Sequence, residues 1–92
     1  MCRNITVLRG LEPSASHEEI EAAARQYVRK VTGVTTVSDK IREPFEAAVA
    51  EIAHITEHLL ADLPERRVPP KTVPPLRRPE VQARIASRAA SA

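Results

Sequence analysis

Apolar residues recur with helical spacing in two long stretches of the chain. In the first, between residues 17 and 32, Ser16 and Glu19 have the spacing of a capping box, and Gly33 is placed to end a helix. The apolar face predicted for this stretch consists of Ile20, Ala23, Ala24, Tyr27 and Val31. The pattern therefore predicts an amphipathic helix that begins after Ser16 and ends before Gly33.

The second stretch begins near residue 38 and runs to Leu63, where Pro64 ends it. Ser38 or Asp39 is placed to cap it. At 100° per residue, its apolar stripe consists of Phe45, Val49, Ile52, Thr56, Leu59 and Leu63. Pro44 falls in the second turn, where it lacks the N–H that the helix needs, so we expect a kink there or a later start near Glu43.

The rest of the chain is predicted to form an arm, a linker and one short helix. Residues 3–12 alternate weakly and favour a short strand or extended arm. Six prolines lie among the sixteen residues 64–79 and predict a semi-rigid linker without a core. Pro79 is placed to begin a last helix, on which Val81 and Ile85 lie one turn apart.

These elements predict an all-α fold. We expect a two-helix hairpin with a long central helix, an extended N-terminal arm, a proline-rich linker and a short C-terminal helix. The expected units are a helical domain over residues 1–63, a basic linker over 64–79, and a short helix or tail over 80–92.

The composition bears on oligomeric state. The 92 residues include one Tyr, one Phe and no Trp, so the core must be aliphatic and small. A partner subunit would cover apolar surface that one short chain leaves exposed. We therefore expect a homodimer.

Charge is divided unevenly along the chain. Residues 1–63 carry seven Lys and Arg against ten Asp and Glu, a net of −3, whereas residues 64–92 carry seven against two, a net of +5. A basic segment beside an acidic domain favours a polyanion or an acidic protein surface as partner, although it can also serve only to keep the chain solvated. The candidate binding residues are Arg3, Arg66, Arg67, Lys71, Arg77 and Arg78.

The only cysteine is Cys2, so no disulfide can form within the chain, which favours a reducing compartment. No apolar run approaches the ~20 residues that a membrane span needs. We therefore expect a cytoplasmic protein that does not cross a membrane.

The segment HITEH at residues 54–58 has the H-x-x-E-H pattern of a zinc-protease motif. His54 and His58 point away from the apolar stripe of their helix, and catalytic zinc also needs a third ligand in a walled cavity. We interpret His54, Glu57 and His58 as surface residues and expect no metal or other cofactor. With two glycines, the chain has no phosphate-binding loop, and we favour a non-enzymatic protein.

Cys2 is the remaining candidate for chemistry. Removal of Met1 would give a chain that begins with a thiol beside an α-amine, a pair that can bind a soft metal or capture an electrophile. Arg3 would lower the thiol pKa. The alternative is that Cys2 packs as a small apolar residue.

Three segments, MCRNI at residues 1–5, EEIEAAARQYVRKVTG at 18–33 and FEAAVAEIA at 45–53, resemble a bacterial family of uncharacterised short proteins. Its members begin Met-Cys-Arg-Asn-Ile and carry QYVRK followed by Val or Ile, Ser or Thr, and Gly. The chain departs from the family at Pro44, His54 and His58. The resemblance implies no particular activity, but it makes an accidental Cys2 less plausible.

The layout of the helices is also similar to the histone fold, with a long central helix between two loops. Val37-Ser38-Asp39 and Lys71-Thr72-Val73 stand where that fold has its DNA-contacting loops. Thr36 replaces the arginine of the first loop, and prolines lengthen the second. This resemblance implies a DNA-binding dimer.

Overall fold

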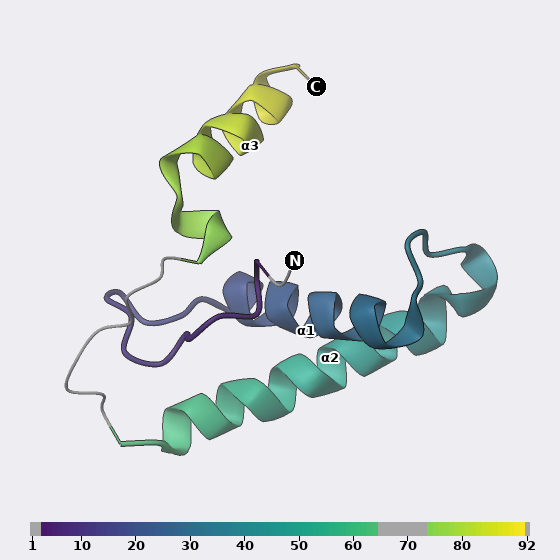
Figure 1. The fold of residues 1–92 in the computed structure, drawn as a ribbon, viewed down its shortest axis with the longest axis horizontal. Coiled ribbons are helices and arrows are strands. Elements are labelled where there is room, and N and C mark those ends of the chain that lie inside the picture. The colour runs from purple at the N-terminus through teal and green to yellow at the C-terminus, as the bar shows by residue number, and fades with distance from the viewer. Residues whose placement is uncertain (1–2, 65–73, 92) are drawn as a thin grey trace.

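The structure is a computed structural model that describes residues 3–64 and 74–91. It contains the helices α1 (His17–Thr32), α2 (Asp39–Asp62) and α3 (Pro79–Ser91), with a short 3₁₀ helix, η1 (Pro75–Arg77), before α3. Within the described ranges there is no strand. Figure 1 shows α1 lying across α2, the N-terminal arm beside α1, and α3 extending away from this pair. The prediction of an all-α fold with a long central helix is confirmed.

The ends of α1 follow the capping signals in the sequence. Ser16 Oγ accepts the backbone N–H of Glu19, and the Glu19 side chain accepts the backbone N–H of Ser16, which completes a capping box. At the other end, Gly33 adopts φ +73°, a left-handed conformation that costs glycine little, and donates its N–H to the carbonyl of Arg29. Both predicted ends of the helix are confirmed.

The core lies where α1 and α2 cross. The buried residues on each helix are spaced four apart: Ile20, Ala24 and Val28 on α1, and Phe45, Val49 and Ala53 on α2. Interlocking of such ridges is the commonest form of helix packing, and small residues on both helices allow a close approach. Leu8 of the arm completes the core, and the partly buried residues packed around it include Ile52 and Leu60.

This packing corrects the predicted apolar faces by about one residue. Tyr27 and Val31 of α1 are 51% and 67% exposed, and Val28 is buried in their place. On α2, Leu59 is 55% exposed, whereas Leu60 packs against the core. The predicted faces followed mixed spacings of three and four residues, but the contact uses a single four-residue ridge on each helix.

α2 begins at Asp39, so the later start near Glu43 is wrong. Pro44 lies in its second turn and removes the hydrogen bond that the carbonyl of Lys40 would otherwise accept. Ser38 is the N-cap residue, but its side chain makes no capping hydrogen bond. The long helix therefore accommodates a proline near its start, where the loss is confined to one bond.

The last part of the predicted linker differs from the prediction. Residues 65–73 lie outside the described residues, but Pro74 is buried and Pro75–Arg77 form η1. The side-chain amide of Gln82 in α3 donates to the carbonyl of Leu76. The segment just before α3 is thus folded against other parts of the chain and is not an extended linker there.

Candidate partner-binding site

Arg77 connects the C-terminal segment to the start of α1. Its Nε donates to Glu19 Oε2 at 2.7 Å and its Nη2 to Glu19 Oε1 at 3.0 Å. Nη2 also lies within hydrogen-bond distance of the carbonyl oxygens of Pro13 at 2.6 Å and Ser14 at 3.1 Å. The side chain of Glu19 is only 4% exposed and that of Arg77 22%, so this is a largely buried ion pair.

The pair explains how a carboxylate is accommodated inside the domain. Hydrogen bonds from Arg77 hold the pKa of the Glu19 carboxyl below its usual value, against burial, which acts in the opposite direction; the backbone N–H of Ser16 adds to the lowering. The same pair raises the pKa of Arg77. Glu19 therefore stays charged and serves both the cap of α1 and the attachment of η1.

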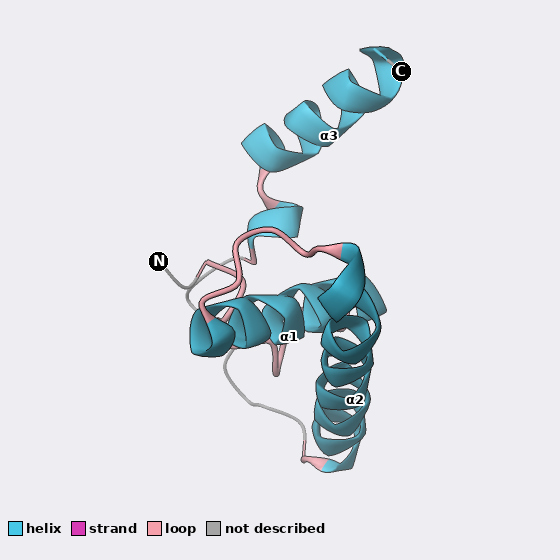
Figure 2. Ribbon diagram, turned by 90° about the vertical axis from the view of Figure 1, so that its right-hand side faces the viewer, coloured by secondary structure: helices cyan, strands magenta, loops and turns pink. Residues whose placement is uncertain are grey.

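Beyond this attachment, little of the described part of the chain lies around α3. It packs mainly against η1, and Figure 2 shows it projecting from the α1–α2 pair. Val81 is half-buried, Ile85 is 45% exposed, and Arg84 and Arg88 are exposed. α3 thus presents apolar and basic side chains at the end of a fixed attachment point.

The N-terminal arm is attached to α1 by one side chain. Gln26 Oε1 accepts the backbone N–H groups of Asn4 at 2.7 Å and Ile5 at 3.1 Å. Beside this contact is an open hollow of about 600 Å³ whose lining includes Arg25, Arg29 and Lys30. The structure thereby brings Asn4 and Ile5, from the first segment that carries the family resemblance, to Gln26 in the second.

The charge of this hollow is partly neutralised. Arg25 donates to Glu46 of α2 at 2.5 and 2.8 Å and also pairs with Glu21 at 3.4 Å. Hydrogen bonding to Arg25 lowers the pKa of the Glu46 carboxyl. Arg29 and Lys30 are exposed, so they contribute the accessible positive charge on this side of α1.

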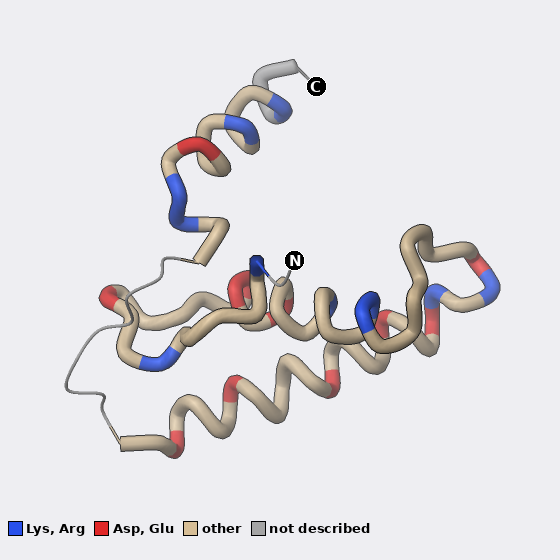
Figure 3. Tube along the Cα trace, in the orientation of Figure 1, with Lys and Arg blue, Asp and Glu red and all other residues tan. Residues whose placement is uncertain are grey.

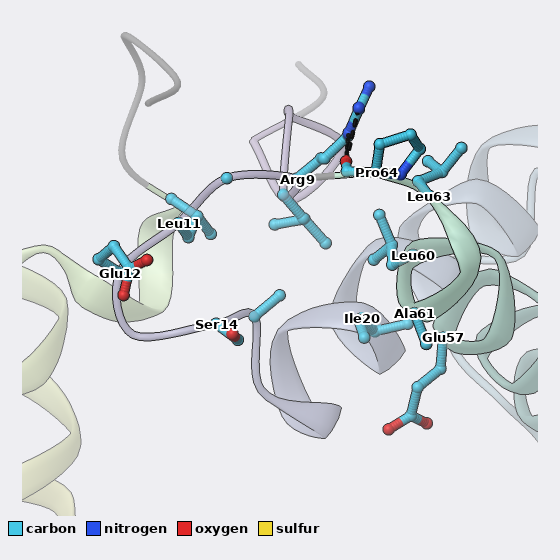
Figure 4. A pocket seen from close by; sticks show the side chains of 13 residues that line it. Arg9, Leu11, Glu12, Ser14, Ile20, Glu57, Leu60, Ala61, Leu63 and Pro64 are labelled. Carbon is cyan, nitrogen blue, oxygen red and sulfur yellow. Dashed lines mark hydrogen bonds between the residues drawn. The ribbon is translucent and has the colours of Figure 1, made fainter. Parts of the chain in front are cut away.

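A second hollow, of about 460 Å³, lies between the arm and the C-terminal end of α2 (Figure 4). The Arg9 guanidinium closes one side by donating to the carbonyl oxygen of Pro64 at 2.7 and 3.1 Å. Leu11, Leu60 and Leu63 give it apolar walls, with Glu57 at its edge. Glu57 also bonds His17 Nδ1 at 3.3 Å, which raises the pKa of that histidine.

The predicted binding residues are only partly described. Arg66, Arg67 and Lys71, like Cys2, lie outside the described residues, and Arg3 is exposed on the arm. Arg77 is engaged within the chain, and Arg78 is half-buried at the end of η1.

His54 and His58 are exposed on α2, as expected from their helical positions, with ring centroids 4.3 Å apart. Glu57 points instead to His17 on α1. Among the described residues, no three His, Cys, Asp or Glu side chains form a group that could hold a metal ion. Nor is any helix in residues 3–64 and 74–91 both long and apolar enough to cross a membrane.

Most of the chain matches a known protein family. Residues 1–84 match the family described as "Uncharacterized conserved protein (DUF2277)". The chain belongs to this family. The match to DUF2277 spans the arm, α1, α2, η1 and the first six residues of α3, and so covers the positions of Glu19 and Arg77. No curated protein and no solved structure matches.

For this member of DUF2277, the sequence did not reveal two connections, those of Glu19 to Arg77 and of Gln26 to the arm. The capping role of Glu19 was visible from Ser16, but its pairing with Arg77 spans 58 residues and leaves no local pattern. In the sequence, Arg84 and Arg88 stood out only as part of the net positive charge of residues 64–92. Their position beside Val81 and Ile85 could have been found from helical spacing.

Proposed function

We propose that this DUF2277 protein is a non-enzymatic helical module that binds a partner protein through its C-terminal segment. The observation that carries the proposal is the position of α3, which is anchored at η1 and otherwise projects from the domain. A short amphipathic helix whose apolar stripe is exposed at Ile85 and half-buried at Val81 fits an apolar surface on another protein. Arg84 and Arg88 fit carboxylates at the rim of such a surface.

Charge distribution supports this choice of partner. Figure 3 shows basic residues on α3 and on the arm, whereas α2 has no Lys or Arg from Glu43 to Asp62. A nucleic acid would use the basic residues of α3 but not Val81 or Ile85. A protein with apolar and acidic groups would use both, so we favour a protein.

The test is a binding experiment on nuclease-treated lysate with four baits. The full chain should retain a partner, whereas a chain ending at Arg78, which keeps the Glu19–Arg77 pair, and the Ile85→Glu variant should not. Arg84→Lys/Arg88→Lys is the matched control and should still bind. Equal recovery by the truncated chain would contradict the proposal. A partner that is recovered from untreated lysate but lost after nuclease treatment, together with duplex DNA binding that falls steeply with salt, would instead indicate a nucleic acid.

A second candidate function is thiol or metal chemistry at Cys2. It is supported by the sequence, in which Arg3 directly follows Cys2, because an adjacent cation favours a thiolate. Intact mass would show whether Met1 is removed, and the pH dependence of alkylation would give the thiol pKa. Retention of Met1 with a thiol pKa near the usual ~8.5 would contradict this candidate.

A further inference from the structure

α2 carries a line of large apolar side chains that the described residues leave exposed. Ile55 is 67% exposed, Leu59 55%, and Leu63, the C-cap residue that follows α2, 38%. They are spaced four residues apart and so follow one another along the helix. This line lies beside the buried face of α2 and is not part of the core. Contiguous exposed aliphatic residues on a small protein indicate a contact surface.

Acidic residues border this line. At 100° per residue, Glu51 and Asp62 lie within about 40° of Ile55 around the helix, and both are exposed. No Lys or Arg interrupts α2 between Glu43 and Asp62. We name this surface the α2 acidic stripe; it consists of Glu51, Ile55, Leu59, Asp62 and Leu63.

α3 carries the complementary arrangement. Val81 and Ile85 lie one turn apart, and Arg84 and Arg88 fall within about 60° of Val81 on the same side of the helix. Ile85 and both arginines are exposed. These four residues form what we name the α3 basic stripe. Each stripe thus has an apolar line bordered by charges, and the two sets of charges have opposite sign.

The two stripes do not meet within one chain. Arg77 fixes η1 against Glu19 and the carbonyl of Pro13, at the start of α1. From there α3 extends away from α2 in both ribbon views (Figures 1 and 2). The acidic stripe of one chain and the basic stripe of the same chain are therefore separated by the body of the domain.

We propose that the α3 basic stripe of one copy docks on the α2 acidic stripe of a second copy, and reciprocally, so that the chain forms a dimer. This inference rests on the proposed function and makes a second copy the partner that α3 binds. Because each chain supplies one donor helix and one acceptor helix, two identical contacts related by a twofold axis close the assembly. Burial of both apolar lines supplies the attraction, and the charges set the pairing.

The test uses two charge-reversed chains and analytical ultracentrifugation. Arg84→Glu/Arg88→Glu makes α3 acidic, and Glu51→Lys/Asp62→Lys makes α2 basic. Each variant alone opposes like charges at both contacts, and its dimer should dissociate at a concentration on the order of 10- to 100-fold higher than that of the unmodified chain. In an equimolar mixture both contacts regain opposite charges, so a 1:1 heterodimer should form. Arg84→Lys/Arg88→Lys is the control and should dimerise normally.

Circular dichroism of each variant establishes that its helices are intact. Two monomeric variants that form a dimer on mixing would support the proposal. Variants that stay monomeric when mixed, or that dimerise alone as well as the unmodified chain does, would overturn it. A monomeric unmodified chain at 1 mM, well above ~1 μM affinities, would also overturn it. That last result would leave the proposed function standing if α3 still retained a different protein.

Discussion

Arg77 donates two hydrogen bonds to the carboxylate of Glu19, a residue 58 positions earlier in the chain. The same carboxylate accepts the backbone N–H of Ser16 at 2.8 Å. One nearly buried acid therefore caps α1 and attaches the segment that leads into α3. This relationship decides where α3 begins and hence which way it can face a partner.

Removing Arg77 should destabilise the protein by more than the loss of a surface charge. Arg77→Met keeps the length of the side chain but leaves the Glu19 carboxylate buried with one hydrogen-bonded partner fewer, at a cost of about 1–3 kcal/mol in the free energy of unfolding. Urea unfolding at fixed protein concentration measures this cost. Lys40→Met, at an exposed site on α2, is the control and should change stability by less than about 0.5 kcal/mol.

A double-mutant cycle with Glu19→Gln isolates the pair itself. In the Glu19→Gln background the Arg77→Met change should cost clearly less, because no carboxylate remains to be left unpaired; the coupling should be about 1–2 kcal/mol. Strictly additive costs would mean that the two side chains contribute independently.

Acid should weaken the fold through the same carboxylate. The pKa of Glu19 is lowered in the folded chain, so the stability it contributes is present above its unfolded pKa of about 4.5 and is lost as the pH falls through the folded value. The free energy of unfolding, measured between pH 6 and pH 3, should therefore fall less steeply in Glu19→Gln than in the unmodified chain. Parallel pH profiles would show that Glu19 does not carry this dependence.

Substitution of Gln26 should release the N-terminal arm without unfolding the helices. Gln26→Leu removes the oxygen that accepts the N–H groups of Asn4 and Ile5, at a cost of about 1 kcal/mol. Amide exchange by NMR should accelerate at Asn4 and Ile5 and stay unchanged at Val49. Gln26→Glu retains an acceptor oxygen and should keep both amides protected. Equal exchange in the two variants would contradict this role.

Core and surface substitutions should differ in their cost to stability at positions where the structure differs from the predicted apolar faces. Val49 is 1% exposed, so Val49→Ala should cost about 2 kcal/mol, whereas Val31→Ala should cost less than about 0.5 kcal/mol because Val31 is 67% exposed. Helical periodicity alone placed both residues in the core. Thermal or urea unfolding distinguishes them, and similar costs would favour the periodicity-based face of α1.

Local signals in the sequence predicted the elements well. The capping box at Ser16, the left-handed Gly33 and the helix-initiating Pro79 each act within one turn, so their effect could be read from neighbouring residues. The buried face of α1 could not be, because it depends on how α2 crosses it. The faces of α1 that contain Val28 and Tyr27 are nearly equivalent in the sequence. Val28 is buried and Tyr27 is exposed because of the way the two helices cross.

The candidate site was predicted less completely for the same reason. The uneven charge distribution indicated the C-terminal segment as a binding region. It gave no reason to distinguish Arg77 from the other cations of that segment. Its partner Glu19 lies in another element, and no periodic pattern links the two. The sequence did not distinguish Arg84 and Arg88 from the other cations. The structure does, because α3 projects from the domain and carries them beside the exposed Ile85.

The most direct test of the central claim asks which chain covers Ile85. A 1:1 mixture of methyl-labelled and unlabelled full-length protein gives isotope-filtered NOEs only across an interface between copies. The account predicts intermolecular NOEs from the Ile85 methyl groups of one copy to Ile55 and Leu59 of the other. NOEs from Ile85 to α2 that arise only within one chain would contradict it. The absence of NOEs between copies, at a concentration where the protein is dimeric, would also contradict it.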